Sequence, residues 1–326
     1  MKPRTRRAPV ALMTMMLLSS CTAGSGQKPP PLGTVPVVRD DSNLTLPLDA
    51  YSFTDHDYIA VQRAQARLVG DCMQRFGVTY PSDISPSALV AGVNFPDFDH
   101  MNARRYGLID AAAAATRGYD PPPDSAAPGK NSGSGAGDTG DTPDASSKDN
   151  GGAALTPQVL FLLNGKTRPE FANVSSMPKD VEGKPLPDDG CAGAAQRRLA
   201  AGKPAQNLLL PSTLGADTSR LAENDSRVQA AMAAWSACVK RAGYQYGSSR
   251  EPNNVNWPEP PGAAEIATAT ADVACKQQTN LVGIWFAVET AYQKQTIERH
   301  SQQLTDLRTY VETMAHTATQ VVNGSD

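Results

Sequence analysis

Two stretches of the sequence decide the fold: CMQRFGVTY at residues 72–80 and CVKRAGYQY at residues 238–246. Cys, Arg, Gly and Tyr hold the same positions in both stretches. Each stretch closes an amphipathic helical pattern, and its Gly stands where Gly commonly ends a helix. Helix ends of this kind also recur by chance, which is the alternative interpretation. If the two stretches are a true repeat, they predict two similar helical units.

The first 21 residues read as an export signal. Four basic residues precede an apolar stretch at residues 8–18, and the stretch ends in Leu-Ser-Ser-Cys at residues 18–21. The apolar part is about half the roughly 20 residues that span a bilayer, so we expect cleavage rather than a permanent membrane helix. The four-residue end resembles the lipobox of bacterial lipoproteins, which implies a lipid on Cys21; an ordinary signal peptide with a chance Cys is the alternative. Export by the Sec or the Tat route stays open.

Four further cysteines remain in the exported chain: Cys72, Cys191, Cys238 and Cys275. An even number of cysteines in an oxidising compartment predicts two disulfides. No two of them form a close pair such as C-x-x-C, which disfavours a metal site, and free buried thiols are the other alternative.

The repeat also selects one of the three connectivities that four cysteines allow. In each unit an acidic residue stands shortly before a second cysteine, Cys191 in one unit and Cys275 in the other. The repeat therefore pairs Cys72 with Cys191 and Cys238 with Cys275. We expect each second cysteine to lie early in the next helix, so that each disulfide clamps a helix hairpin.

Several helix starts are visible in the sequence. Thr54 is followed by Asp57 as a capping box, with Phe53 and Tyr58 as a hydrophobic staple, and predicts a helix up to Gly77. Further helices are predicted at residues 104–117, at residues 157–163 after a Thr-Pro start, around Cys191, and after the cap residue Asp225.

The C-terminal part of the chain has no Pro from about residue 263 to residue 315. Its apolar residues form a helical stripe that begins at Leu281 and ends at Met314, and predict one long helix. This stripe packs on the chain's own helices or presents a coiled-coil face to an envelope or cell-wall partner.

These patterns predict a mainly α protein, an irregular helical fold of two disulfide-clamped helix units with a long C-terminal helix and Pro/Gly-rich loops. We expect a signal peptide at residues 1–20 and a lipidated N-terminus with a flexible tether at residues 21–46. One discontinuous helical domain follows at residues 47–119 and 155–318. Residues 120–154 contain no large apolar side chain and are predicted to be a disordered insertion, and residues 319–326 a disordered tail.

Charge excludes one class of function. The formal charge is -3, and without the four basic residues of the leader it falls to -7. A mildly acidic chain lacks the clustered Lys and Arg that nucleic-acid phosphates require. We expect no nucleic-acid partner.

The sequence predicts no catalytic, cofactor-binding or metal-binding residues. The four His residues fall in no metal-ligand spacing, and no serine lies in a G-x-S-x-G elbow. A loop with Asp97, Asp99 and His100 is either a weak cation site or simply solvated. A further set of aromatic residues forms either a ligand groove or part of the core: Trp235, Trp285, Tyr244 and Tyr246.

The lipobox, the two C-x-x-R-x-G helix ends, the Asp272–Lys276 segment and the Trp285 helix together resemble lipoproteins of high-GC Gram-positive bacteria that have no assigned activity. The likeness covers residues 50–118 and 155–312. It implies a fold and an address on the outer face of the cell membrane, and it transfers no functional residue.

The function that the sequence favours is a non-enzymatic surface lipoprotein, a binding or scaffolding module of the cell envelope attached to the membrane through Cys21. The alternatives are a substrate-binding carrier for a transporter and an envelope hydrolase of unrecognised type. A carrier is expected to have two lobes with parallel sheets, and a hydrolase a pocket with convergent carboxylates or a His beside a nucleophile.

Overall fold

The computed structural model describes residues 28–40, 44–80, 102, 104–121 and 156–324. Within these ranges the chain forms α-helices, short 3-10 turns and one isolated β-bridge, between Lys179 and Pro185, which confirms a mainly α fold. The α-helices are α1 (Asp55–Arg75), α3 (Ala111–Arg117), α4 (Pro157–Asn164), α5 (Gly190–Leu199), α6 (Leu210–Glu223), α7 (Ser226–Arg241), α8 (Ala263–Thr279), α9 (Leu281–Arg299) and α10 (Ser301–Asn323). The 3-10 turns are η1 (Pro47–Tyr51), η2 (Gly165–Thr167), η3 (Pro169–Phe171) and η4 (Pro252–Asn254).

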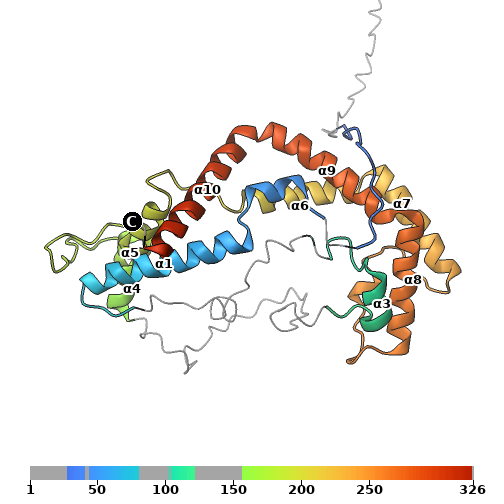
Figure 1. Ribbon diagram of the computed structural model, residues 1–326, viewed down its shortest axis with the longest axis horizontal. Coiled ribbons are helices and arrows are strands. Elements are labelled where there is room, and N and C mark those ends of the chain that lie inside the picture. Colours follow the sequence, from blue (N-terminus) through green and yellow to red (C-terminus); the bar gives the residue numbers. More distant parts are fainter. Residues whose placement is uncertain (1–27, 41–43, 81–101, 103, 122–155, 325–326) are drawn as a thin grey trace, which may run out of the picture.

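The helices are arranged along an arch made by α9 and α10 (Figure 1). At the α10 end, α1 and α5 pack beneath it around Leu304 and Tyr310. At the other end, α7 and α8 pack with α9 around Trp235 and Trp285, and α3 lies against α8. The helix α6 and the turn η1 lie under the middle of the arch, between its two ends.

The predicted start of α1 and the predicted C-terminal ends of α1 and α7 are confirmed. The Thr54 hydroxyl accepts from the Asp57 amide at 3.1 Å, and the rings of Phe53 and Tyr58 meet edge-on at 6.3 Å. The helices α1 and α7 both end in a Schellman motif, whose left-handed residues are Gly77 (φ 76°) and Gly243 (φ 97°). The shared Gly of the two sequence stretches therefore has a shared backbone role.

Both predicted disulfides are confirmed. Cys72 pairs with Cys191, and Cys238 pairs with Cys275, with Cα atoms 5.7 and 5.6 Å apart. The expected placement of the second cysteines is right for Cys191, at the start of α5, and wrong for Cys275, in the last turns of α8. The long link between α7 and α8 lets α8 meet the end of α7 with its own C-terminal part. The two units thus share the helix end that carries the first cysteine, but they differ in where the second cysteine lies in its helix.

The helix predicted at residues 104–117 is shorter than expected. Only α3 is helical, and Asp110 caps it by accepting from the amides of Ala112 and Ala113 at 2.6 and 3.0 Å. Before it, Arg104 (φ 59°) and Gly107 (φ 79°) have left-handed backbone conformations that a helix does not contain. Residues 104–110 are instead a loop that buries Tyr106 and Ile109 in the core that contains α9, and Leu108 against α8.

The prediction of a single long C-terminal helix is also wrong, because the chain bends twice in this region and forms α8, α9 and α10. Asn280 ends α8 in a left-handed conformation (φ 48°), which Asn tolerates better than most residues, and His300 separates α9 from α10. The stripe from Leu281 to Met314 is largely buried in the chain's own cores, and Ile297 packs partly buried against them. Binding to an envelope partner stays a prediction, and such a partner would have to contact side chains outside this buried stripe.

The predicted tail is also partly helical. The helix α10 continues to Asn323, and Val321 is buried in the core that α10 shares with α1. The Val321 carbonyl accepts from Arg67 Nη1 at 2.9 Å. The helical domain therefore extends past residue 318, its predicted end.

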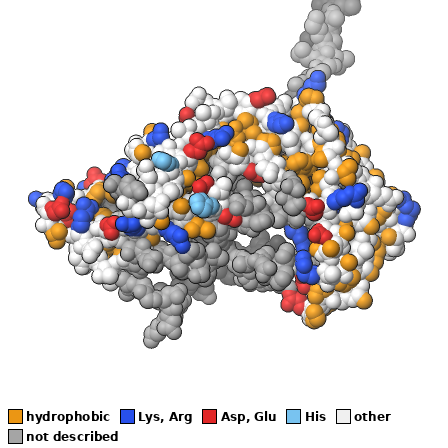
Figure 2. Space-filling view, in the orientation of Figure 1, with side chains coloured by type: hydrophobic (Ala, Val, Ile, Leu, Met, Phe, Trp, Pro, Cys, Tyr) orange, Lys and Arg blue, Asp and Glu red, His pale blue; other side chains and the backbone are white. Residues whose placement is uncertain are grey.

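The described part of the predicted tether packs on the helices. The Pro30 carbonyl accepts from Arg227 Nη1 at 2.9 Å, and the Pro36 carbonyl accepts from Asn280 Nδ2 at 3.0 Å. A Cβ on Gly283 would lie only 1.9 Å from the Pro36 oxygen, so the missing side chain permits this approach. Residues 28–40 cross α9, where hydrophobic side chains gather on the surface (Figure 2), and leave a hollow of about 600 Å³ against it. The prediction of a flexible tether is wrong for these residues.

Other predictions lie outside the described residues. They include the signal peptide and Cys21, nearly all of the 120–154 insertion, and the loop with Asp97, Asp99 and His100.

Candidate ligand-binding site

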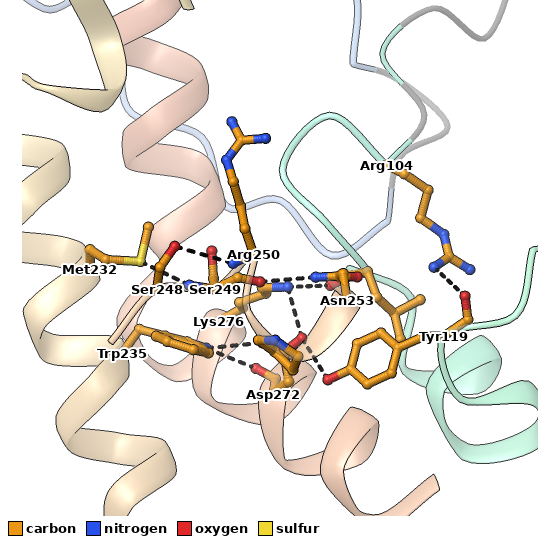
Figure 3. A network of polar contacts seen from close by, with 12 residues as sticks. Arg104, Tyr119, Met232, Trp235, Ser248, Ser249, Arg250, Asn253, Asp272 and Lys276 are labelled. Atoms are coloured by element: carbon orange, nitrogen blue, oxygen red, sulfur yellow. Dashed lines mark hydrogen bonds and ion pairs between the residues drawn. The ribbon is translucent and has the colours of Figure 1, made fainter. Parts of the chain in front are cut away.

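A closed polar cluster lies on α8 beside the 104–121 segment (Figure 3). Lys276 Nζ is 2.9 Å from Asp272 Oδ2, one turn earlier on the same helix, and it also donates to the Leu108 carbonyl at 2.9 Å. Asp272 accepts in addition from Trp235 Nε1 on α7 at 3.0 Å and from the Tyr119 hydroxyl at 3.3 Å. The cluster joins α7, α8 and the 104–121 segment.

Burial dominates the electrostatics of this pair. Burial raises the pKa of the Asp272 carboxyl, although the nearby Lys276 charge acts to lower it. Burial also lowers the pKa of the Lys276 ammonium, although the charge of Asp272 acts to raise it. Hydrogen-bond donors surround the carboxylate and acceptors surround the ammonium, which favours the charged forms. Because 0 % of the Lys276 side chain and 2 % of the Asp272 side chain are exposed, the cluster has a structural role.

A surface hollow of about 390 Å³ opens near this cluster, with Arg104 and Arg250 in its lining. Arg104 donates to the carbonyls of residues 119 and 120, and Arg250 Nε is 3.3 Å from Glu223 Oε1. Figure 3 shows the Arg250 guanidinium turned away from Asp272. The charged groups of this hollow are therefore already engaged with the protein.

A further cavity, which we name the η1 cleft, lies where η1, the loop around Arg105, α6 and α9 meet. Its volume is about 320 Å³. Apolar side chains and small α6 residues form its walls, and polar side chains converge on it from all four segments. Its lining residues are Leu46, Leu48, Asp49, Ser52, Asn102, Arg105, Pro211, Ser212, Gly215, Ala216, Ser219 and Gln293.

A buried ion pair holds Arg105, one of the residues that line the η1 cleft. Glu289 of α9 is fully buried, and its Oε1 accepts from Arg105 Nε at 3.0 Å and also from Arg105 Nη2. The other oxygen, Oε2, accepts from the Tyr106 hydroxyl at 2.8 Å. Burial acts to lower the pKa of Arg105, but the bonds and charge of Glu289 outweigh it, so this pKa is raised. Arg105 lines the cleft, and 24 % of its side chain is exposed.

The side of the η1 cleft is held by η1 and α9. Asp49 Oδ2 accepts from the Leu46 amide at 2.7 Å and from Asn102 Nδ2 at 2.6 Å. Burial nevertheless raises the pKa of Asp49, because these bonds offset only part of the lost hydration. Gln293, one turn after Glu289, accepts from the Leu48 amide through Oε1 at 2.9 Å.

Several polar atoms of the η1 cleft have no hydrogen-bond partner among the described residues, and they include Asn102 Oδ1 and the hydroxyls of Ser52 and Ser219. Three further such atoms belong to side chains that other bonds hold in place. They are Asp49 Oδ1, Arg105 Nη1 and Gln293 Nε2. Each belongs to a side chain whose other polar atoms are fixed by the bonds just given. These three side chains thus offer the cleft one acceptor and two donors that are held in place by other bonds, which is the property of a ligand site.

Four aromatic residues were predicted to line either a ligand groove or the core, and the two tryptophans among them belong to the core. Trp235 and Trp285 are 0 % and 1 % exposed, and Tyr244 and Tyr246 pack partly buried against the same core. Nowhere in the described ranges do three His, Cys, Asp or Glu residues gather as metal ligands would. Among the described helices, none has the length and apolar character needed to cross a membrane.

The sequence analysis missed every polar residue of the η1 cleft. One signal was present, because Glu289 is the single acid in the otherwise apolar run LVGIWFAVETAY of residues 281–292. An acid on the buried face of such a helix requires a cationic or donor partner. Arg105, Asn102 and Asp49 carry no comparable local signal, since only the tertiary fold brings them to Glu289.

Comparison with protein-family models, with curated proteins and with solved structures finds no match to this chain.

The structural role of the α8 cluster is testable against a matched exposed pair. Lys276→Met leaves Asp272 buried without its counter-charge, and we expect a loss of about 3 to 5 kcal/mol in the free energy of unfolding. Arg308→Met breaks an acid–base pair of the same spacing with Glu312, which is exposed, and should cost less than about 1 kcal/mol. Urea unfolding measures both, and equal losses would contradict the assignment.

Proposed function

We propose that the protein is a lipid-anchored, non-enzymatic binding module of the cell envelope, and that the η1 cleft is its ligand site. The address rests on the leader, on the lipobox-like end at Cys21, and on the resemblance of the motifs to envelope lipoproteins. The binding role rests on the cleft.

One observation carries the binding role: Arg105 lines the η1 cleft, and its ion pair with buried Glu289 is complete without a ligand. Arg105 supplies the counter-charge of Glu289, and Tyr106 donates a hydrogen bond to its other oxygen, so this pair needs no ligand to be stable. Arg105 Nη1 nevertheless has no hydrogen-bond partner among the described residues. A site built in this way binds with little reorganisation, which favours affinity.

The packed N-terminal segment sets the distance to the membrane in this proposal. Six residues separate Cys21 from Lys28, where the described chain begins. At about 3.5 Å per residue this link spans at most roughly 25 Å. A lipid on Cys21 therefore holds α7 and α9 near the membrane surface, closer than a tether reaching to residue 46 would.

Replacement of the anchor residue tests the address. Cys21→Ala in a bacterial host with a lipoprotein pathway should leave the precursor uncut or release the protein into the medium, because no acyl chain can be attached. Membrane fractionation and detergent partitioning measure this. An unchanged membrane fraction for Cys21→Ala would refute the anchoring.

Filling the cleft tests the binding role. A Cβ added to Gly215 meets no atom within 4 Å, so Gly215→Leu places its side chain in open cleft space and replaces a helix-weakening residue. We expect the variant to fold, with an unfolding temperature equal to or above that of the native protein. In a ligand-observed NMR screen of small polar fragments, it should lose binders that the native protein retains.

Thr213→Leu is the matched control, since Thr213 is exposed on the same helix and does not line the cleft. It should keep all binders. The binding role falls if no fragment depends on Gly215→Leu, or if Thr213→Leu loses the same fragments. The carrier and hydrolase alternatives stay predictions.

A further inference from the structure

We infer that the η1 cleft binds a small zwitterion with the head group of a free α-amino acid, its ammonium on Asp49 and its carboxylate on Arg105 and Gln293. This inference rests on the proposed function, because it names the ligand class of the same site. It depends on the charges of the cleft, on the kinds of its unused hydrogen-bonding atoms and on its size.

The charges of the cleft do not sum to zero. Arg105 is matched by Glu289 in a direct ion pair, whereas Asp49 makes no ion pair with any described residue. Its two bonds come from neutral groups, the Leu46 amide and the Asn102 amide. An ammonium group beside Asp49 would supply the missing counter-charge in a partly dehydrated site, where such a contact is strong.

A ligand that carries only one charge meets an opposing group. A simple amine is attracted by Asp49 but repelled by the Arg105 guanidinium. A simple carboxylate is attracted by Arg105 but repelled by Asp49 and, at longer range, by Glu289. A ligand with both groups satisfies Asp49 and Arg105 together, so the cleft should discriminate against either half of it.

The unused atoms of Asp49, Arg105 and Gln293 match this head group in kind. Asp49 Oδ1 accepts hydrogen bonds, as an ammonium requires, and Arg105 Nη1 and Gln293 Nε2 donate them, as a carboxylate requires. Gln293 is 1 % exposed and is held by the Leu48 amide through its other atom, so its NH₂ group has a fixed direction. The ligand is therefore met by positioned groups rather than by mobile surface side chains.

The size of the cleft limits the ligand to a small molecule. A volume of about 320 Å³ admits a free amino acid, and Leu46, Leu48 and Pro211 offer an apolar wall for an aliphatic side chain. The two ends of a longer peptide are too far apart to occupy Asp49 and Arg105 together. The size and the charges thus select the same class of ligand.

The experiment compares matched probes on purified full-length protein at pH 7 by isothermal titration calorimetry. L-alanine carries both charged groups, propionate and ethylamine carry one each, and glycine betaine carries both charges but no N–H donor for Asp49. We expect L-alanine to bind at least tenfold more tightly than each of the other three. Gly215→Leu should abolish L-alanine binding, and Thr213→Leu should leave it unchanged.

Asp49→Asn separates binding from folding. The amide oxygen that this substitution introduces can accept both bonds that Asp49 Oδ2 accepts. Because burial beside Glu289 raises the pKa of Asp49 despite the opposing charge of Arg105, its ionised form costs stability above that pKa. The variant should therefore unfold at an equal or higher temperature at pH 7, while its affinity for L-alanine falls at least tenfold.

Three results would overturn the inference: no binding of L-alanine, equal binding of propionate or ethylamine, or unchanged affinity in Asp49→Asn. The fragment screen with Gly215→Leu decides separately whether the cleft is a ligand site. If that screen finds cleft-dependent binders of another class, the zwitterion inference alone fails. If it finds none, the binding role fails with it.

Discussion

The buried carboxylate of Glu289 constrains the centre of this molecule. An ionised carboxylate in the middle of α9 is costly unless it is paired and hydrogen-bonded on both oxygens. Arg105 and Tyr106 meet that requirement, so the loop that carries them must lie against α9. That loop also positions Asn102, which bonds to Asp49 and so fixes η1. The η1 cleft is the space that these linked contacts enclose with α6.

The Lys276–Asp272 pair of α8 is also buried, and it differs from the Arg105–Glu289 pair in one respect that separates their roles. Lys276 is 0 % exposed and its ammonium is shared between Asp272 and a backbone carbonyl, whereas Arg105 is 24 % exposed and keeps one guanidinium nitrogen for the cleft. The first pair closes an interface between helices. The second pair supports an open surface. The disulfide at Cys275 stands directly beside Lys276 and fixes the same part of α8 to α7, which stiffens the end of the arch.

Local features of the fold could be predicted from the sequence, and tertiary ones could not. The caps at Thr54 and Asp225 and the glycine ends of α1 and α7 depend on neighbouring residues alone, and they were found. The breaks at Asn280 and His300 were missed because neither residue is a strong helix breaker, and the apolar spacing continues through both. The packed N-terminal segment was missed because its compatibility with α9 depends on Gly283, a residue far away in the sequence. The candidate site was missed for the same reason, since its groups come from four separate segments.

The coupling between Arg105 and Glu289 is the most direct test of this account. A double-mutant cycle with Arg105→Met and Glu289→Gln, measured by urea unfolding, isolates it from other effects. The account predicts a coupling energy on the order of 2 to 3 kcal/mol, with the double variant more stable than Arg105→Met alone, because removing the guanidinium leaves a buried charge without a counter-charge. Losses that add within about 0.5 kcal/mol would show that the pair does not organise the centre of the molecule.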